Sequence, residues 1–409
     1  MRLETRPTSS RSSRGELPRP QPHAPWPEDL DQPVRDALTL PVGASHTRGT
    51  ERVNVAVIGA GVAGLSAALG ARLAGARVLV LEAETSIGSG ATGRNAGILS
   101  AGINMGLAEL PPESPDRDMW PSTTAELLAL TADARRPDSL LIASLTGAIS
   151  LAETATAARH LTREARARID MGLRAEIWAA EQVAEATAGR LDTAGVVEAL
   201  WLPDEGRIQP LTLLAYLAEK ARNSGVSLVG GVRTVGWEEK TTRTHLRPYW
   251  QLHLQGGETA QAEGLLIATG PTVQPTGRLY ALSFRADLPE TFPLFWDAAP
   301  YTYCDFRPGQ GRLTVSGGRY GEPGNSQRDS RYHRRLADAA RRWLPELGGE
   351  QPAYAWAVDI AVNSRLRPTA RRLEGKAPGY AIEGLGALGV LPGSVLGRRA
   401  GEQLAHELV

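Results

Sequence analysis

A glycine-rich turn between a buried strand and a helix is the feature of this sequence that most restricts the fold. Residues 53–58, VNVAVI, form a mostly apolar and β-branched run, which is typical of a strand inside a parallel sheet covered on both faces. The turn GAGVAG follows at residues 59–64, and the Ala- and Leu-rich stretch after it favours a helix. This order of strand, tight turn and helix predicts a Rossmann-like α/β fold.

Each glycine of this turn has a physical task in binding a dinucleotide. Gly59 permits the turn, Gly61 lets backbone N–H groups approach a pyrophosphate, and Gly64 lets the helix touch the strand. The start of the helix adds partial positive charge. A second apolar strand, from Arg77 to Leu81, ends at Glu82, at about the 20-residue distance expected for the acid that binds a ribose. An acid there disfavours NADP, but NAD and FAD share this first turn.

Three further segments bear on the choice between NAD and FAD. The first, GSGATGRNAG at residues 88–97, is rich in glycine. The second, GLLIATG at residues 264–270, is an apolar strand that ends in a glycine. The third, residues 381–408, joins a glycine-rich turn to a helix whose apolar residues recur every four positions from Leu396. An NAD-dependent dehydrogenase would use the same first turn, but it leaves the segment 88–97 without a role.

Together, GAGVAGLSAAL, VLEA and GSGATGRNAG resemble the start of the D-amino-acid-oxidase-like FAD-dependent oxidoreductases, especially the branch of glycine oxidase, sarcosine oxidase and γ-glutamylputrescine oxidoreductase. The resemblance runs from about Val53 to the end of the chain. It implies bound FAD and a Rossmann-like FAD-binding domain assembled from distant segments. The residues that it places against FAD are Gly59, Gly61, Val62, Ala63, Gly64, Glu82, Ala83, Ser89, Gly90, Ala91, Thr92, Arg94, Asn95, Ala96, Val235, Ala268, Thr269, Gly270, Gly389, Leu391, Pro392, Gly393 and Ser394.

The C-terminal glycine-rich turn departs from the family's pattern. Family members commonly carry a His-Gly pair there, whereas residues 386–393 read GALGVLPG. The backbone role is expected to survive, with a helix N-terminus aimed at the flavin's pyrimidine edge, where reduction creates an anion. Covalent FAD in the family often uses a cysteine in the C-terminal part, and Cys304 does not lie in the matching segment. We therefore expect noncovalent FAD.

The rest of the chain is expected to form a domain that covers the flavin. Residues 122–190 read mostly as amphipathic helices, interrupted by a short apolar piece at residues 147–152. Alternating patterns predict a small antiparallel meander over residues 235–261. Further strands are predicted at Tyr301–Phe306, Arg312–Arg319 and Ala353–Val362. The resemblance makes these last strands part of an antiparallel substrate sheet.

Polar and aromatic residues of these strands are the candidates for contact with substrate. The predicted catalytic or substrate-binding residues are Arg319, Tyr320, Trp356 and Asp359, with Tyr301 and Tyr303 as further candidates. WAVDIAVN, residues 356–363, resembles the WGGxIDIT-type strand of the γ-glutamylputrescine branch, but Ala357 and Val358 replace glycines and would narrow the pocket. Arg365 or Arg367 is an alternative anchor for a substrate carboxylate, by bidentate pairing.

Composition argues against several classes of function. Lys plus Arg and Asp plus Glu each total 45, so no net charge favours nucleic acid or an anionic membrane. The single cysteine excludes an intrachain disulfide, the seven histidines lack metal-ligand spacing, and no apolar run is long enough for a membrane span. Residues 1–50, rich in Pro, Arg and Ser, show no targeting signal and are predicted to be disordered or loosely packed. We expect a cytoplasmic protein that binds no metal.

These observations give two expected domains and one expected reaction. The FAD-binding domain takes residues 51–110, 201–283 and 376–409, and a substrate domain with a mixed antiparallel sheet and helices takes residues 111–200 and 284–375. The resemblance implies oxidation of a C–N bond: an amine or amino acid gives hydride to flavin N5, the imine hydrolyses, and dioxygen or another acceptor reoxidises the flavin. The alternatives are an NAD-dependent dehydrogenase and a flavin-binding protein without turnover.

Overall fold

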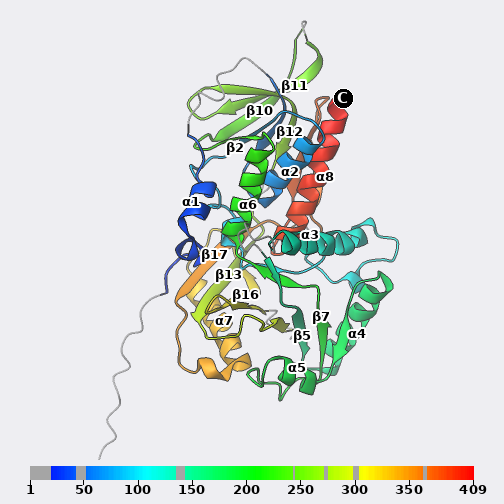
Figure 1. The fold of residues 1–409 in the computed structure, drawn as a ribbon, viewed down its shortest axis with the longest axis vertical. Helices are drawn as coiled ribbons and strands as arrows, with labels where there is room; N and C mark the ends of the chain where they lie inside the picture. Colours follow the sequence, from blue (N-terminus) through cyan, green and yellow to red (C-terminus); the bar gives the residue numbers. More distant parts are fainter. Residues whose placement is uncertain are drawn as a thin grey trace, which may run out of the picture.

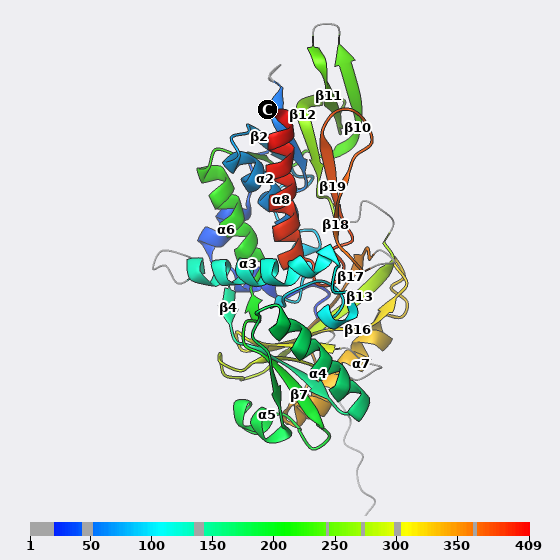
Figure 2. The ribbon, with the colours of Figure 1, turned by 90° about the vertical axis from the view of Figure 1, so that its right-hand side faces the viewer.

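Two lobes, each built on an eight-stranded sheet, make up the part of the chain that the structure describes. This computed structural model describes residues 20–42, 52–134, 143–242, 245–270, 275–297, 304–362 and 366–409. The lobes lie one above the other in Figure 1, and helix α3 (Met119–Ala134) crosses the junction between them, as the turned view in Figure 2 also shows. The two-lobe α/β architecture confirms the predicted fold class.

The upper lobe contains the sheet that the first glycine-rich turn predicted. Its strands follow the order β10-β11-β12-β1-β2-β9, and β19 and β18 extend it from β12. They are β1 (Val53–Ile58), β2 (Val78–Leu81), β9 (Ser227–Val229), β10 (Thr234–Thr242), β11 (His245–Leu254), β12 (Thr259–Ile267), β18 (Thr369–Arg372) and β19 (Gly379–Glu383). Strands β9, β2, β1, β12 and β19 run parallel, whereas β10, β11 and β12 form the antiparallel meander that the alternating sequence predicted.

Three helices cover the upper sheet: α2 (Val62–Leu73), α6 (Pro210–Asn223) and α8 (Val390–Leu408). Helices α2 and α8 come from opposite ends of the chain but lie side by side (Figures 1 and 2). Glycines allow this contact, because a Cβ at Gly401 would overlap the carbonyl oxygen of Ala67. The C-terminal helix is therefore part of the core that supports the first turn.

The lower lobe contains a mixed sheet with the order β17-β13-β16-β15-β14-β5-β7-β6. Its strands are β5 (Ala148–Ala152), β6 (Glu176–Trp178), β7 (Glu198–Leu202), β13 (Gly277–Arg285), β14 (Leu294–Asp297), β15 (Cys304–Gly309), β16 (Arg312–Gly321) and β17 (Tyr354–Ile360). Only β14 and β5 pair in parallel among these described neighbours. Helix α7 (Asp329–Trp343) covers one face through Leu336, Ala340 and Trp343, while α4 (Ala155–Asp170) and α5 (Ala180–Ala186) pack near β7.

Short elements connect the lobes. Strands β3 (Ile98–Leu99), β4 (Ala143–Leu145) and β8 (Gly206–Ile208) form a small antiparallel sheet. The 3₁₀ helices are η1 (Trp26–Asp29), η3 (Thr92–Arg94), η4 (Leu107–Glu109), η5 (Pro115–Asp118) and η6 (Pro345–Leu347). Because β3 directly follows the segment 88–97, this small sheet fixes the glycine-rich segment between the two lobes.

Two strands lie in a different sheet from the one that the expected domain boundaries imply. Residues 277–283, assigned to the FAD-binding domain, are part of β13, which pairs with β16 and β17 of the lower sheet. Residues 369–372, assigned to the substrate domain, form β18, which pairs with β19 of the upper sheet. Backbone hydrogen bonds between distant strands decide these memberships, and the pattern of a single strand does not reveal its partners.

Part of the N-terminal extension is firmly packed, which corrects the prediction of a loosely packed segment. Residues 1–19 and 43–50 lie outside the described residues, but residues 20–42 contact both lobes. In the lower lobe, the backbone of Gln21 pairs with the start of β17: its amide donates to Ala353 O at 3.0 Å, and its carbonyl oxygen accepts from the Ala355 amide at 2.9 Å. In the upper lobe, α1 (Gln32–Leu38) packs against α6. The contacts are tertiary, so the Pro-rich sequence, which lacks apolar periodicity, gave no sign of them.

Trp26 is the centre of this N-terminal packing. Its side chain is fully buried, and its indole Nε1 donates to the carbonyl oxygen of Asn95 at 2.9 Å. The guanidinium of Arg307 in β15 lies 4.8 Å from the centre of the Trp26 ring. Trp26 thus joins the N-terminal segment to the glycine-rich segment 88–97 and to the lower sheet.

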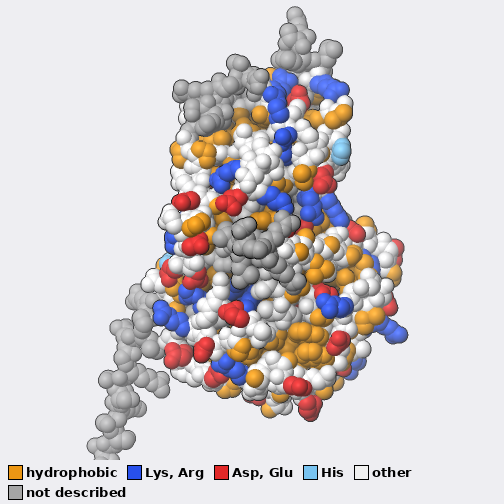
Figure 3. Space-filling model, in the orientation of Figure 1, with side chains coloured by type: hydrophobic (Ala, Val, Ile, Leu, Met, Phe, Trp, Pro, Cys, Tyr) orange, Lys and Arg blue, Asp and Glu red, His pale blue; other side chains and the backbone are white. Residues whose placement is uncertain are grey.

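On the face drawn in Figure 3, basic and acidic side chains are interspersed over both lobes, so neither sign of charge dominates this face. Among the described residues, no helix combines the length and the apolar composition needed to cross a membrane. The same residues contain no cluster of three His, Cys, Asp or Glu side chains that would bind a metal ion.

Candidate cofactor and substrate site

The first glycine-rich turn has the close packing that its sequence predicted. Gly59 has a φ of +97°, and a Cβ on it would lie 2.6 Å from the carbonyl oxygen of Ala268 at the end of β12. A Cβ on Gly64 would overlap the carbonyl oxygen of Gly59. Glycine is required at both positions by conformation or by contact, so the turn brings β1, α2 and β12 together.

Gly61 is different because it faces open space. Its φ is −71°, which any residue adopts, and the atom nearest to a Cβ there would be Thr92 Oγ1, at 3.4 Å. Helix α2 begins directly after it without a side-chain cap. The Val62 amide donates to Thr92 Oγ1 at 3.3 Å, which links the helix start to the second glycine-rich segment. This open helix N-terminus is a favourable place for an anion.

Glu82 lies at the carboxyl end of β2, beside this helix start. Its Oε2 accepts a hydrogen bond from the Ala60 amide at 2.8 Å, and its Oε1 accepts one from the Glu84 amide at 3.1 Å. The chain after β9 also reaches this place, because the Val232 amide donates to the carbonyl oxygen of Glu82 at 2.9 Å. Val235, the expected adenine contact, lies three residues further on in β10 with its side chain exposed.

Both lobes hold the segment 88–97. A Cβ on Gly93 would overlap the carbonyl oxygen of Gly88, so the segment folds tightly on itself around η3. Within it, Asn95 Oδ1 accepts a hydrogen bond from the Gly97 amide at 2.8 Å. From the lower sheet, Trp356 Nε1 donates to the carbonyl oxygen of Arg94 at 2.9 Å. The segment is therefore a rigid lining between the upper turn and the lower sheet.

A narrow pocket with a cavity volume of about 70 Å³ lies where these elements meet. Its lining comes from the start of α2, the segment 88–97, and the ends of β12, β17 and β19. The lining residues are Ala63, Ala91, Ala268, Gly270, Asp359, Ile360, Ala361, Ile382, Gly384, Leu385 and Gly386. Four of the predicted cofactor residues, Ala63, Ala91, Ala268 and Gly270, thus face one space that five separate parts of the sequence line. It lies at the carboxyl ends of β12 and β19, two parallel strands, which is where α/β folds bind nucleotides.

The start of α8 borders the same region through its backbone. Its N-cap, Gly389, provides no side-chain cap, and a Cβ on Gly393 would lie 3.3 Å from Val62 Cγ1 in α2. The side chain of Ser394 is buried and donates to Glu126 Oε1 of α3 at 2.5 Å. Ser394 therefore ties α8 to α3 with its side chain, which is engaged within the protein.

Two of the four predicted catalytic residues serve the fold. Trp356 is buried, and its indole nitrogen is bonded to the segment 88–97. Asp359 borders the pocket, but its carboxylate accepts from Arg278 Nη1 at 2.9 Å and from the Gly324 amide at 3.1 Å. Arg278 also pairs with Asp329 at the start of α7, so the Asp359 side chain points to the α7 side of the sheet.

The other two predicted residues lie in β16 and are more accessible. Tyr320 is 52% exposed, and its Cβ lies beside Gly277 of β13. Arg319 is exposed and makes no hydrogen bond or ion pair with the described part of the chain. Tyr301, Tyr303 and Arg365 lie outside the described residues. Arg367 pairs with Asp116 at 2.8 Å.

The structure also reveals a carboxyl group that the sequence predictions missed. Asp305 in β15 is half-buried, and burial, together with the nearby carboxylate of Asp297, raises its pKa to about 7. The alternation in CDFRPG gave a signal, because Asp305 and Arg307 are polar residues at every second position of an otherwise apolar strand. Strand alternation alone does not say which face of the strand meets a ligand.

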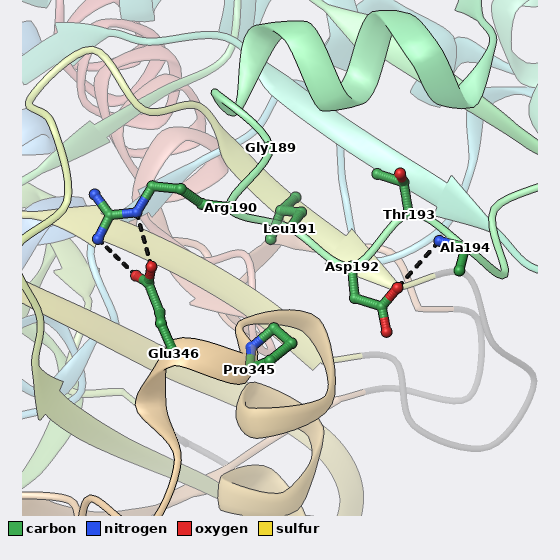
Figure 4. A pocket seen from close by; sticks show the side chains of 8 residues that line it. All are labelled: Gly189, Arg190, Leu191, Asp192, Thr193, Ala194, Pro345 and Glu346. Atoms are coloured by element: carbon green, nitrogen blue, oxygen red, sulfur yellow. Dashed lines mark hydrogen bonds and ion pairs between the residues drawn. The ribbon is translucent and has the colours of Figure 1, made fainter.

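A more open hollow lies elsewhere on the lower lobe (Figure 4). It is lined by residues 189–194 and by Pro345 and Glu346 of η6, and Arg190 closes one side by donating to Glu346 at 2.6 and 3.0 Å. Neither a helix N-terminus of the upper lobe nor the segment 88–97 reaches it. The pocket beside α2 is therefore the better candidate for a cofactor site.

Comparison with known proteins agrees with this geometry. The sequence profile of the family described as DAO, FAD dependent oxidoreductase, matches residues 54–403. The crystal structure of glycine oxidase from Geobacillus kaustophilus superposes with a TM-score of 0.71 at 22% identity, covering 88% of this chain and 95% of that one. The structure of L-proline dehydrogenase from P. horikoshii superposes with a TM-score of 0.73 at 17% identity, covering 87% and 94%. At these identities the likeness shows a shared fold.

One curated protein matches over a short stretch. The mitochondrial L-2-hydroxyglutarate dehydrogenase of Arabidopsis thaliana is 44% identical over 61 residues. This stretch spans 15% of this chain and 13% of that protein. The match is therefore local, whereas the match to the family profile covers most of the chain.

Proposed function

Because this chain belongs to the FAD-dependent oxidoreductase family, we propose that it uses noncovalently bound FAD to oxidise the C–N bond of an amine or amino acid. The pocket beside α2 is the observation that supports this most, since it joins the start of α2, the segment 88–97 and the ends of β12 and β19. The fold is shared with a glycine oxidase and an L-proline dehydrogenase, whose names both denote oxidation beside nitrogen. The upper lobe would form the FAD-binding domain and the lower lobe the substrate domain.

The residues of the upper lobe fit the parts of FAD. The open N-terminus of α2 at Gly61 suits the pyrophosphate, and Glu82 suits a ribose hydroxyl. The segment 88–97 would border the flavin ring, and the uncapped start of α8 would stabilise negative charge on its pyrimidine edge. When bound, FAD supplies the hydride-accepting chemistry, and the chain itself orients the substrate and excludes water.

Cys304 supports the noncovalent part of the proposal by its position. It is buried in the core between the lower sheet and α7, together with Phe306 on the same face of β15. Burial, with the nearby carboxylates of Asp297 and Asp305, raises the pKa of its thiol. A protonated thiol on the α7 side of the sheet is poorly placed to form a bond with a flavin on the other side.

The purified protein is expected to be yellow and to release all of its FAD on acid denaturation, because no cysteine faces the pocket. Anaerobic mixing with a panel of amines and amino acids should bleach the flavin absorbance. A colourless protein that cannot be reconstituted with FAD would contradict the whole proposal, including FAD binding. FAD that stays bound but is bleached by no amine would instead favour a flavin-binding protein without turnover.

Replacing Glu82 by alanine should weaken FAD binding by about 1.5–3 kcal/mol, because it removes a charged acceptor for a ribose hydroxyl without filling the site. This corresponds to about a 10- to 150-fold higher dissociation constant for FAD, measured by fluorescence titration of the apoprotein. Glu84→Ala is the matched control, because Glu84 lies two residues on and pairs with Arg233 at the surface. An equal loss of affinity in both variants would remove Glu82 from the ribose site.

The electron acceptor and the cellular location belong to this proposal as well. We propose dioxygen or another small acceptor, and measuring hydrogen peroxide after substrate reduction would distinguish these two cases. We also propose a cytoplasmic location, which the single cysteine supports because it excludes an intrachain disulfide.

A further inference from the structure

We propose that Asp305 binds the protonated amino group of the substrate and accepts its proton, so that the enzyme selects cationic amines. The inference rests on the proposed amine oxidation, and it adds a catalytic residue and a substrate charge to it. Asp305 lies in β15, at the middle of the lower sheet, between β14 and β16.

The register of the sheet defines the face on which Asp305 lies. Side chains alternate along β15, so Cys304 and Phe306 point into the core under α7, and Asp305 and Arg307 point to the opposite face. On the neighbouring strands, Asp305 is paired with Ser316 of β16 and Trp296 of β14. This face is therefore turned away from α7 and carries polar groups at its centre.

The same face lies against the segment that we propose as the flavin's lining. Arg307, two residues along β15, donates from Nε to the carbonyl oxygen of Gly97 at 3.2 Å. Trp296, the other neighbour of Asp305, packs in one cluster with Ala96 and Ile98. Side chains two residues apart on one face of a strand are separated by about 7 Å. Asp305 is therefore close to residues 96–98, on the side of the sheet that faces the cofactor segment.

The carboxyl group of Asp305 is free for a ligand. Within the described part of the chain it makes no hydrogen bond and no ion pair. Arg307 makes no ion pair with Asp305 in the described part of the chain. Its Nε and Nη2 donate to Gly97 O and Ile208 O, and its Nη1 is buried without a partner there. By contrast, the carboxylates of Asp297 and Asp359 both have partners in the protein. Asp305 thus differs from Asp297 and Asp359, because its carboxyl group makes no hydrogen bond or ion pair that stabilises the described part of the fold.

The surroundings of Asp305 fit a proton acceptor at neutral pH. The titratable and charged groups around it are Asp297, Cys304 and Tyr320 in the sheet and Arg307 beside it in β15. Burial first, and then Asp297, raises the Asp305 pKa to about 7. An acceptor whose pKa lies near the working pH transfers protons most effectively.

The proton transfer is balanced without any further reagent. The ammonium group of the substrate gives one proton to an Asp305 carboxylate oxygen, which leaves a neutral amine and a protonated carboxyl. With FAD bound in the upper lobe as the hydride acceptor, the freed nitrogen lone pair would be available to form the C=N bond as the neighbouring carbon loses its hydride. An ionised Asp305 is needed at the start, so substrate capture should increase as the pH rises through about 7.

The test compares Asp305→Asn, Asp305→Glu and the control Asp338→Asn, which changes an exposed carboxylate of α7 on the other side of the same sheet. Two quantities are measured. The first is amine binding, by calorimetry with FAD-loaded protein. The second is anaerobic flavin reduction over a range of about 3.5 pH units, about pH 5.5–9, which includes the Asp305 pKa of about 7. Asp305→Asn should keep its FAD, bind cationic amines about 10- to 100-fold more weakly, and lose the rise near pH 7. Asp305→Glu should retain part of the affinity and of the pH dependence, and Asp338→Asn should behave as wild type.

Each outcome decides between the two proposals. If amines reduce the wild-type flavin and Asp305→Asn keeps both its affinity and its pH dependence, the role of Asp305 is wrong and amine oxidation stands. If no amine binds to or reduces the FAD-loaded wild type, the proposal of amine oxidation is wrong, and the proposed role of Asp305, which depends on it, is wrong as well. If Asp305→Asn binds neutral amides as well as cationic amines, while wild type prefers the cationic ones, the charge of Asp305 sets the substrate class.

Discussion

Replacing Gly61 by valine is expected to abolish FAD retention and to leave the apoprotein folded. The backbone at Gly61 is extended, and a Cβ there would meet only Thr92 Oγ1 at 3.4 Å, so the chain itself accommodates the side chain. The valine would instead occupy the space in front of the start of α2, where the pyrophosphate is proposed to bind. We expect the affinity for FAD to fall more than about 100-fold, or about 2.7 kcal/mol, measured by reconstitution of the apoprotein.

Two glycine variants separate loss of cofactor from loss of fold. Gly64→Ala should unfold the turn itself, because a Cβ there overlaps the carbonyl oxygen of Gly59. Gly349→Val is the matched control, because Gly349 is exposed and has nothing within 4 Å of an added Cβ. Circular dichroism of the apoproteins and their FAD content would show the difference. Full FAD binding by Gly61→Val would place the pyrophosphate elsewhere.

Replacing Trp26 by alanine is expected to lower the free energy of unfolding by about 3–5 kcal/mol. The ring is fully buried, lies over the Arg307 guanidinium and donates to the carbonyl oxygen of Asn95. Arg307 Nη1 is buried without a partner among the described residues, so water that enters the cavity would solvate it. Because solvation of Arg307 Nη1 would partly offset the lost packing, we expect the decrease in the free energy of unfolding to lie toward the lower end of this range. Thermal and urea unfolding followed by circular dichroism would measure it.

Trp237→Ala provides the comparison for Trp26→Ala, because the Trp237 side chain is 43% exposed on β10. A surface change of this kind should alter the free energy of unfolding by no more than about 0.5 kcal/mol. Because Trp26 also contacts the segment 88–97, Trp26→Ala should lower FAD affinity as well. Equal stability of the two variants would mean that residues 20–42 do not contribute to the fold.

The first strand–turn–helix unit was predictable because all of its signals are local. The β-branched run, the glycines and the following helix lie within about 30 residues, and each glycine has a steric reason that does not depend on distant strands. The resemblance to a known family added the other cofactor segments and the mixed sheet. The structure agrees with the first unit, in the positive φ of Gly59 and in the parallel pairing of β1 with β2 and β12, and with the mixed lower sheet.

The substrate side was less predictable because the same residue types serve structure and chemistry. Trp356 and Asp359 have the character of site residues, yet one is bonded to Arg94 and the other is paired with Arg278. Asp305 looked like one polar residue in an apolar strand, and only the tertiary structure shows that its carboxyl group has no partner among the described residues. A sequence lists the polar groups, but hydrogen-bond partners come from other strands and helices.

By itself, the sequence determined the Rossmann-like start, the family and the positions where strand, turn and helix must pack closely, because turn geometry and hydrophobic periodicity act over short distances. Only the tertiary structure decided which sheet β13 and β18 join and that residues 20–42 pack against both lobes. It also decided that the carboxyl group of Asp305 on the lower sheet has no partner among the described residues. These properties depend on contacts between residues far apart in the chain, and such contacts form only when the whole fold is assembled.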